Sequence, residues 1–118
     1  MAGRSEAFKA KELDIVTWND VVIWTRQDAA TFGVDPEFML RIAWCESFGN
    51  PYAVGWYAGE VGPYQFNPQY PSVWYELPES RQVPLNYSKV SIRMQVQAAA
   101  RAFSLGLQGH WSCYWSTR

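Results

Sequence analysis

One predicted helix, which ends on a glutamate directly before a segment rich in glycine and proline, constrains this chain more than any other feature. Apolar residues recur at helical spacing along residues 36–48, and Glu46 falls on the same face in the last turn. Asp35-Pro36 is a typical helix start, with an N-cap residue and a first-turn proline. Gly49 can take the left-handed conformation that ends a helix, and Pro51 cannot continue one. The pattern therefore places one carboxyl group on the inward side of a helix end.

The predicted position of Glu46 favours an acid that keeps its proton near pH 7. Burial on an apolar face disfavours the ionised carboxylate, and the negative end of the helix dipole acts in the same direction. Both effects raise the pKa of Glu46, which suits a general acid because its proton must be available at the working pH. The alternative is a partly exposed glutamate at a fraying helix end.

Two further helices are predicted, one on each side of this element. Thr17-Trp18-Asn19-Asp20 resembles a capping box, which predicts a helix over about residues 18–31 that Gly33 stops. A later helix opens at Ser88 or Ser91. The apolar stripe of this later helix consists of Ile92, Val96, Ala99, Ala100 and Phe103.

The segment between Pro51 and Tyr75 cannot form a long helix, because three glycines and four prolines interrupt it. Residues 54–58 and 62–66 are expected to be short extended pieces that can pair as a small β-hairpin. Residues 69–75 are expected to form a short helix.

The predicted fold class is mainly α, in an α+β arrangement with a small helical domain and a short glycine-rich insertion. We expect a cleft between the helical part and the insertion, with Glu46 at its edge. Residues 1–16 are expected to be a polar N-terminal arm, and residues 17–118 the domain.

Composition excludes several classes of function. The 118 residues suffice for one domain with a core. A net charge of -1 without a basic block predicts no nucleic-acid partner, and no apolar run is long enough to span a membrane. The first residues lack the apolar core of a signal peptide, so export would need another route or a leader removed from this chain. Seven Trp, seven Tyr and six Phe exceed what so small a core hides, which predicts aromatic side chains at a binding surface.

The two cysteines, Cys45 and Cys113, allow one pairing. A disulfide would close a long loop and stabilise the fold by about 4 kcal/mol in the chain-entropy model. Composition is equally consistent with two buried free thiols. A metal site made from these cysteines, His110 and a carboxylate is a weak alternative, because one histidine and such wide spacing do not match common ligand patterns. We expect no metal and no cofactor.

Short motifs spread along the chain resemble one family in combination. Residues 45–50 read Cys-Glu-Ser-Phe-Gly-Asn, residues 62–66 read Gly-Pro-Tyr-Gln-Phe, and residues 111–113 read Trp-Ser-Cys. Together with Trp74 and an alanine-rich late helix, they resemble the lysozyme-like superfamily. Within it they are most similar to the lytic transglycosylases and the resuscitation-promoting factors of actinobacteria. The resemblance covers roughly residues 33–114.

This resemblance implies a role for individual residues. Glu46 would be the catalytic acid/base and Ser47 would support it, while Cys45 and Cys113 would form a disulfide. Gly62 would let the backbone approach a sugar chain. The other substrate-binding residues implied are Tyr57, Tyr64, Gln65, Trp74 and Gln95.

The chain also departs from the family pattern at several points. Pro63 stands where relatives usually carry Leu, Phe or Gly. Asn67 stands where goose-type lysozymes carry an acid. The Asn-Ala-Gly motif of many soluble lytic transglycosylases has no clear counterpart here.

The substrate implied is peptidoglycan, cleaved between N-acetylmuramic acid and N-acetylglucosamine by a monomer acting outside the cytoplasm. The enzyme would be secreted, attached to the cell wall or delivered by a phage. Most glycosidases need a second carboxylate, and the acids that follow Glu46 are Glu60, Glu76 and Glu79. A lytic transglycosylase needs only Glu46, whereas a hydrolytic muramidase or endolysin would use Glu60 to position water. A non-catalytic module that binds cell wall or belongs to a virion is the remaining alternative.

Overall fold

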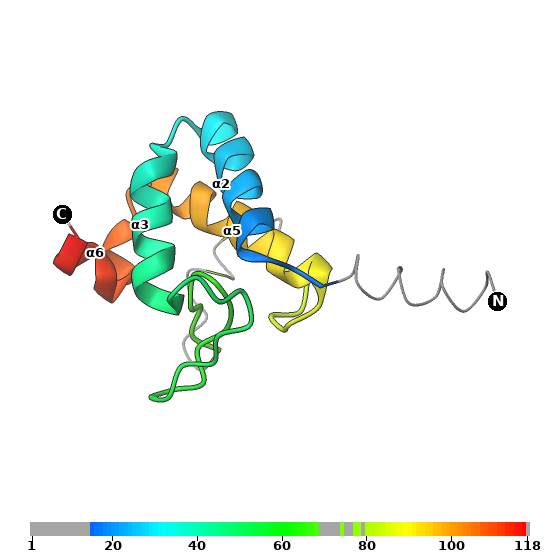
Figure 1. Cartoon of the computed structure of the whole chain (residues 1–118). Helices are drawn as coiled ribbons and strands as arrows, with labels where there is room; N and C mark the ends of the chain where they lie inside the picture. Colours follow the sequence, from blue (N-terminus) through cyan, green and yellow to red (C-terminus); the bar gives the residue numbers. More distant parts are fainter. Residues whose placement is uncertain (1–14, 69–73, 75–76, 79, 118) are drawn as a thin grey trace.

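The computed structural model describes residues 15–68, 74, 77–78 and 80–117. Figure 1 shows the helices of this part grouped around a common centre, with the insertion extending from one end of the group. Most of the expected N-terminal arm over residues 1–16 lies outside the described residues. So does most of the expected short helix over residues 69–75.

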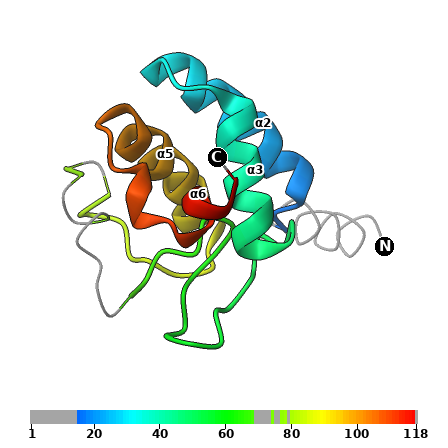
Figure 2. The same cartoon turned by 90° about the vertical axis from the view of Figure 1, so that its left-hand side faces the viewer.

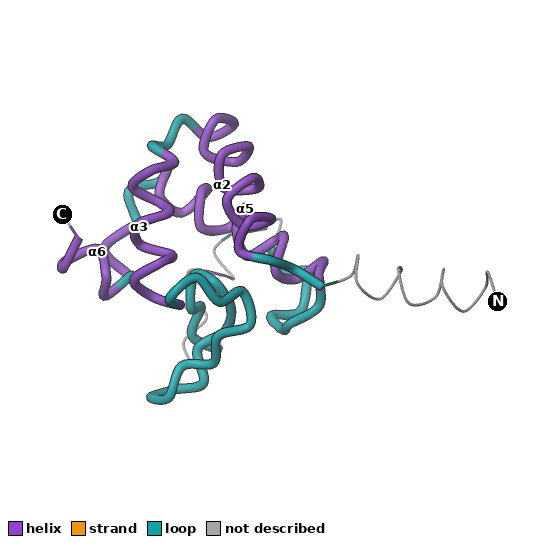
Figure 3. The backbone as a smooth tube through the Cα atoms, in the orientation of Figure 1, coloured by secondary structure: helices purple, strands orange, loops and turns teal. Residues whose placement is uncertain are grey.

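The described part is mainly helical, as the sequence predicted. Figure 3 shows helices and loops and no strand along the described backbone. Among the described residues, no helix is both long enough and apolar enough to cross a membrane. The elements in chain order are α2 (Trp18–Phe32), α3 (Pro36–Ser47), α5 (Lys89–Ser104), the 3₁₀ turn η1 (Gln108–His110) and α6 (Ser112–Thr117).

Helix α2 begins and ends where its local sequence predicts. The Thr17 hydroxyl accepts a hydrogen bond from the Asp20 N–H at 3.2 Å, and an Asp20 carboxylate oxygen accepts one from the Thr17 N–H at 2.9 Å. This reciprocal pair is the expected capping box. Gly33 ends the helix in the left-handed conformation, with φ of 70°.

Helix α3 begins as predicted and ends slightly earlier. The Asp35 carboxylate accepts a hydrogen bond from the Glu37 N–H at 3.0 Å. The left-handed conformation expected at Gly49 already occurs at Phe48, with φ of 53°, and continues at Gly49, with φ of 76°. A Cβ atom at Gly49 would lie 2.3 Å from the Trp44 ring, so this second position requires glycine. Two successive left-handed residues turn the chain sharply into the insertion.

Helix α5 packs against α2 along a fully buried stripe. Its N-cap is Ser88, whose hydroxyl accepts a hydrogen bond from the Ser91 N–H at 3.1 Å. The five predicted stripe residues are all buried. An ion pair joins the two helices: the Arg93 guanidinium donates to both carboxylate oxygens of Asp28, at 2.5 and 3.0 Å.

The insertion is shaped by isolated pairings and by one side chain. Val61 pairs with Val54 and with Phe66 as isolated antiparallel bridges, which is less than the expected hairpin. The Gln65 amide nitrogen donates to the carbonyl oxygens of Gly62 and Ala53, at 2.8 and 2.9 Å, and to a third carbonyl in the same segment. The same three carbonyl oxygens also accept backbone N–H groups, so the Gln65 amide adds a second hydrogen bond at each and ties the loop together.

The C-terminal helix α6 lies against α3, as Figure 2 shows from the side. The Trp111 indole N–H, just before α6, donates to the Tyr64 carbonyl oxygen at 2.7 Å. A disulfide joins Cys45 of α3 to Cys113 of α6. The pairing that the family resemblance implied is therefore present.

Candidate active site

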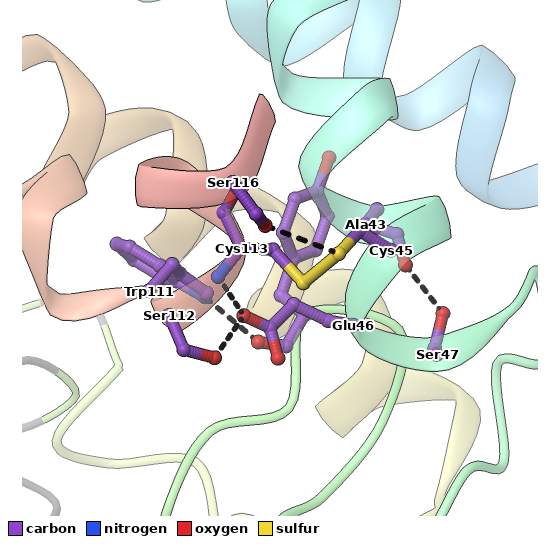
Figure 4. The surroundings of a disulfide bond; sticks show 9 residues. Ala43, Cys45, Glu46, Ser47, Trp111, Ser112, Cys113 and Ser116 are labelled. Carbon is purple, nitrogen blue, oxygen red and sulfur yellow. Dashed lines mark hydrogen bonds between the residues drawn. A yellow bond between two sulfur atoms is a disulfide. The ribbon is translucent and has the colours of Figure 1, made fainter. Parts of the chain in front are cut away.

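Glu46 lies half-buried in the last turn of α3, beside the buried side chains of Met39, Ile42 and Ala43. Figure 4 shows its carboxylate directed toward the start of α6. One oxygen, Oε1, accepts a hydrogen bond from the backbone N–H of Cys113 at 3.1 Å and one from the Ser112 hydroxyl at 3.3 Å.

Burial raises the pKa of Glu46, in the direction that the sequence predicted. The hydrogen bonds from Cys113 and Ser112 oppose this effect because they stabilise the carboxylate, while the negative charge of Glu60 adds to it. Desolvation is the largest of these causes, so the site favours a protonated acid more than a free glutamate does. A carboxyl group with a raised pKa keeps its proton to higher pH than a free glutamate, which suits a general acid.

The disulfide lies immediately beside this acid. Cys45 precedes Glu46 in the chain, and Cys113 supplies one of its two hydrogen-bond donors. Because both sulfur atoms are bonded to each other, neither cysteine is available as a thiolate ligand. The metal-site alternative, which needed both, is therefore wrong.

Ser47 faces the interior and not Glu46. Its hydroxyl donates to the Ala43 carbonyl oxygen at 2.7 Å, and its side chain is buried. This bond supports the last turn of α3, the turn that carries the acid. The family resemblance gave Ser47 a supporting role, and the contact indicates how such support would act.

Gly62 and Gln95 contact each other inside the fold. A Cβ atom at Gly62 would lie 1.8 Å from Gln95 Oε1, and Gln95 is 0% exposed. The Gln95 amide nitrogen donates to the Asn86 carbonyl oxygen and to the Ser91 hydroxyl. In this structure the missing side chain of Gly62 makes room for α5, whereas we had expected it to make room for a sugar chain. Gln95 is likewise out of reach of a glycan.

The aromatic residues expected at the binding surface divide into two groups. Tyr64 and Trp74 are 0% and 1% exposed and belong to the core. The prediction that they line a binding surface is therefore not met in this structure. The Tyr64 hydroxyl shares a hydrogen bond with Thr25 at 2.9 Å, and burial raises the pKa of Tyr64. Tyr57 is 83% exposed, and Trp56 beside it is 94% exposed.

The sequence alone did not single out two residues of interest here, Trp56 and Ser112. Trp56 adjoins Tyr57 between two glycines, and an aromatic pair in a glycine-flanked loop is a usable signal for an exposed tip. Ser112 is the variable position inside Trp-Ser-Cys, and no local pattern connects it with Glu46, 66 residues earlier.

Glu60 is bound within the insertion. Its carboxylate accepts a hydrogen bond from the Ala58 N–H at 2.7 Å, and a Cβ atom at Gly55 would lie 2.6 Å from it. The loop therefore folds tightly around this carboxylate. Its charge still acts on Glu46 through the pKa effect described above.

Comparison with known protein families assigns the segment that carries Glu46 to one family. A family model described as the transglycosylase SLT domain matches residues 24–84, just over half of the chain, including Glu46 and the whole insertion. No curated protein and no solved structure matches the chain. The family acts on peptidoglycan as lytic transglycosylases. The resemblance found in the sequence is confirmed: the chain belongs to the transglycosylase SLT domain family.

Proposed function

We propose that this protein is a lytic transglycosylase that cleaves the β-1,4 bond between N-acetylmuramic acid and N-acetylglucosamine, with Glu46 as its single general acid/base. One observation carries the proposal. Glu46 is a half-buried acid with a raised pKa, at the end of a helix in the segment that the family model matches.

In this mechanism Glu46 first donates its proton to the glycosidic oxygen as the bond to C1 breaks. Positive charge develops on the muramic acid ring in an oxocarbenium-like state. The carboxylate then accepts the proton of the C6 hydroxyl of the same sugar, and O6 bonds to C1. The products are a 1,6-anhydro sugar and a free hydroxyl on the departing glycan, and Glu46 is protonated again.

The contacts of Glu60 favour this single-acid route. One oxygen of the Glu60 carboxylate accepts the Ala58 N–H, and the group packs against Gly55. A carboxylate held by its own loop in this way has fewer acceptor sites left to position a water. These contacts support a role in shaping the insertion.

A hydrolytic muramidase that uses Glu46 with Glu60 is the second candidate. The observation in its favour is that the charge of Glu60 raises the pKa of Glu46, so the two carboxylates influence each other. A non-catalytic module for cell-wall binding would require that neither carboxylate matters for cleavage.

Tyr57 and Trp56 are proposed to contact the glycan. Their rings pack edge to face, with centroids 5.9 Å apart, and both are largely exposed. A ring face held in this way offers a flat apolar surface to the C–H face of a sugar. Binding of peptidoglycan implies action outside the cytoplasm.

Mass spectrometry of purified peptidoglycan after digestion tests the proposal. The parent protein should release 1,6-anhydro muropeptides, and Glu46→Gln should lower the rate by about 10²–10⁴-fold, the usual contribution of a general acid. Glu60→Gln keeps an oxygen for the Ala58 N–H and is the matched control, with the parent product expected. Reducing muropeptides that depend on both carboxylates would support the muramidase. No cleavage by the parent would point to the binding module.

A further inference from the structure

We propose that Ser112 and the backbone N–H of Cys113, held in place by the disulfide, are positioning groups that fix Glu46 Oε1 and leave Oε2 to carry the proton that is transferred. This inference rests on the proposed function, in which Glu46 is the acid. It adds a role for α6, which lies outside the segment that the family model matches.

The two hydrogen bonds make the carboxyl oxygens unequal. Both donors converge on Oε1, and among the described residues no hydrogen bond ends on Oε2. An oxygen that already accepts two hydrogen bonds has little capacity left to carry a proton itself. Protonation of Glu46 is therefore directed to Oε2, which Figure 4 shows turned away from the Cys113 N–H.

The disulfide is what keeps these donors at Glu46. Helix α6 has six residues, too few to be stable alone. The disulfide bonds it to the residue next to Glu46, and the Tyr114 ring also packs on Phe38, with centroids 5.9 Å apart. Trp111 anchors the preceding residues to the Tyr64 carbonyl independently of the cysteines. Opening the disulfide should therefore loosen α6 while the core stays folded.

Reduction of this disulfide is a balanced exchange with an external dithiol. The dithiol attacks one sulfur as a thiolate, and the resulting mixed disulfide is resolved by its second thiol. Cys45 and Cys113 gain two electrons and two protons in total and become free thiols. The dithiol becomes a cyclic disulfide. The Cys113 N–H is then no longer tied to the neighbour of Glu46.

The experiment is a titration of the Glu46 carboxyl carbon followed by NMR, on the parent protein, Ser112→Ala and the parent reduced by dithiothreitol. Loss of a donor destabilises the carboxylate, so the pKa of Glu46 should rise in both altered proteins. Ser116→Ala is the matched control: its hydroxyl lies on the same helix, donates to the Cys113 carbonyl oxygen and lies 3.9 Å from Cys45 Sγ, but makes no hydrogen bond to Glu46. It should leave the titration unchanged, and Ser112→Thr should restore the parent value.

Peptidoglycan cleavage is measured in parallel as a function of pH. Ser112→Ala should lower the maximal rate by about two- to tenfold, the usual effect of one hydrogen bond. The alkaline limb of its profile should move to higher pH, because the acid stays protonated longer. A Glu46 titration that is the same in the parent, Ser112→Ala and the reduced protein would overturn the inference, even if the enzyme cleaves as proposed. Full cleavage by Glu46→Gln would instead overturn the proposed function, and with it any catalytic purpose of this positioning.

Comparing the parent, Ser112→Ala and the reduced protein also distinguishes a loss of Glu46 positioning from a loss of folding. Circular dichroism of the reduced protein shows whether the helices remain. If reduction unfolds the chain, the decision falls to Ser112→Ala, which keeps the disulfide and removes one exposed hydroxyl.

Discussion

Replacing Gly62 by alanine should destabilise the fold far more than replacing Gly59. Both glycines have positive φ, 84° and 69°, so alanine at either position incurs a backbone cost of about 1–2 kcal/mol. The surroundings differ. A Cβ atom at Gly59 has no atom within 4 Å, whereas at Gly62 it would lie 1.8 Å from Gln95 Oε1 and 2.9 Å from its Cδ.

Gln95 cannot move aside without further loss. It is 0% exposed, and its amide nitrogen donates to the Asn86 carbonyl oxygen at 2.9 Å and to the Ser91 hydroxyl at 3.2 Å. Overpacking of a filled interior costs about 1–3 kcal/mol. Gly62→Ala should therefore lower the free energy of unfolding by about 2–5 kcal/mol, and Gly59→Ala by about 1–2 kcal/mol.

Urea unfolding followed by tryptophan fluorescence measures both values. The double variant Gly62→Ala/Gln95→Ala removes the clashing side chain, so its cost should be smaller than the sum of the two single costs. Equal destabilisation by Gly59→Ala and Gly62→Ala would refute the reasoning, since it would leave backbone strain as the only effect. Additive single costs would also refute it, because the contact would then carry no energy.

Three further changes have predicted effects on stability. Reducing the disulfide should lower the free energy of unfolding by about 4 kcal/mol, because it reopens a loop of 68 residues; an unchanged urea midpoint would contradict this. Glu46→Gln should stabilise the fold at pH values above the raised pKa of Glu46, where the parent carries a half-buried negative charge. The gain should vanish in acid, where the parent and variant side chains are both neutral. A gain in thermal stability that persists at low pH would argue against this prediction. Arg93→Ala should destabilise the protein by about 3 kcal/mol, because it leaves the buried Asp28 carboxylate without its ion-pair partner. Arg26→Ala, which breaks an exposed pair with Glu37, should cost less than about 1 kcal/mol. Urea unfolding measures both values.

Local sequence was sufficient to predict helices α2, α3 and α5 and most of their ends, but not the short helix α6. The capping box at Thr17, the N-cap at Asp35 and the buried stripe of α5 each depend on residues within a turn or two of one another. Such interactions have the same geometry in any fold, so their signal is present in the chain itself. The disulfide could not be predicted from local sequence, because two cysteines can pair or stay free. Only the family resemblance favoured pairing.

The interior of the insertion was not predictable in the same way. Gln65 was expected to direct polar atoms toward a cleft, but its amide nitrogen donates to three backbone carbonyls of its own loop. The three acceptors lie 3, 5 and 12 residues before Gln65 in the chain, and only the fold of the insertion brings them together around its side chain. The burial of Tyr64 and Trp74 was not predictable either. Aromatic composition gives the number of rings in the chain but does not indicate which of them pack in the core.

The inequality of the two Glu46 oxygens has a consequence for the proposed chemistry. With Oε1 accepting from Ser112 and Cys113, the proton that leaves for the glycosidic oxygen and the proton that returns from the C6 hydroxyl must both pass through Oε2. This is sterically consistent, because a 1,6-anhydro bridge joins C1 on the β face, the face from which the β-linked oxygen departs. One acid on one face therefore serves both steps. An inverting hydrolysis would need a second base on the opposite face, where water attacks. The hydrogen bonds of α6 thus fit a reaction in which one carboxyl oxygen serves both proton transfers.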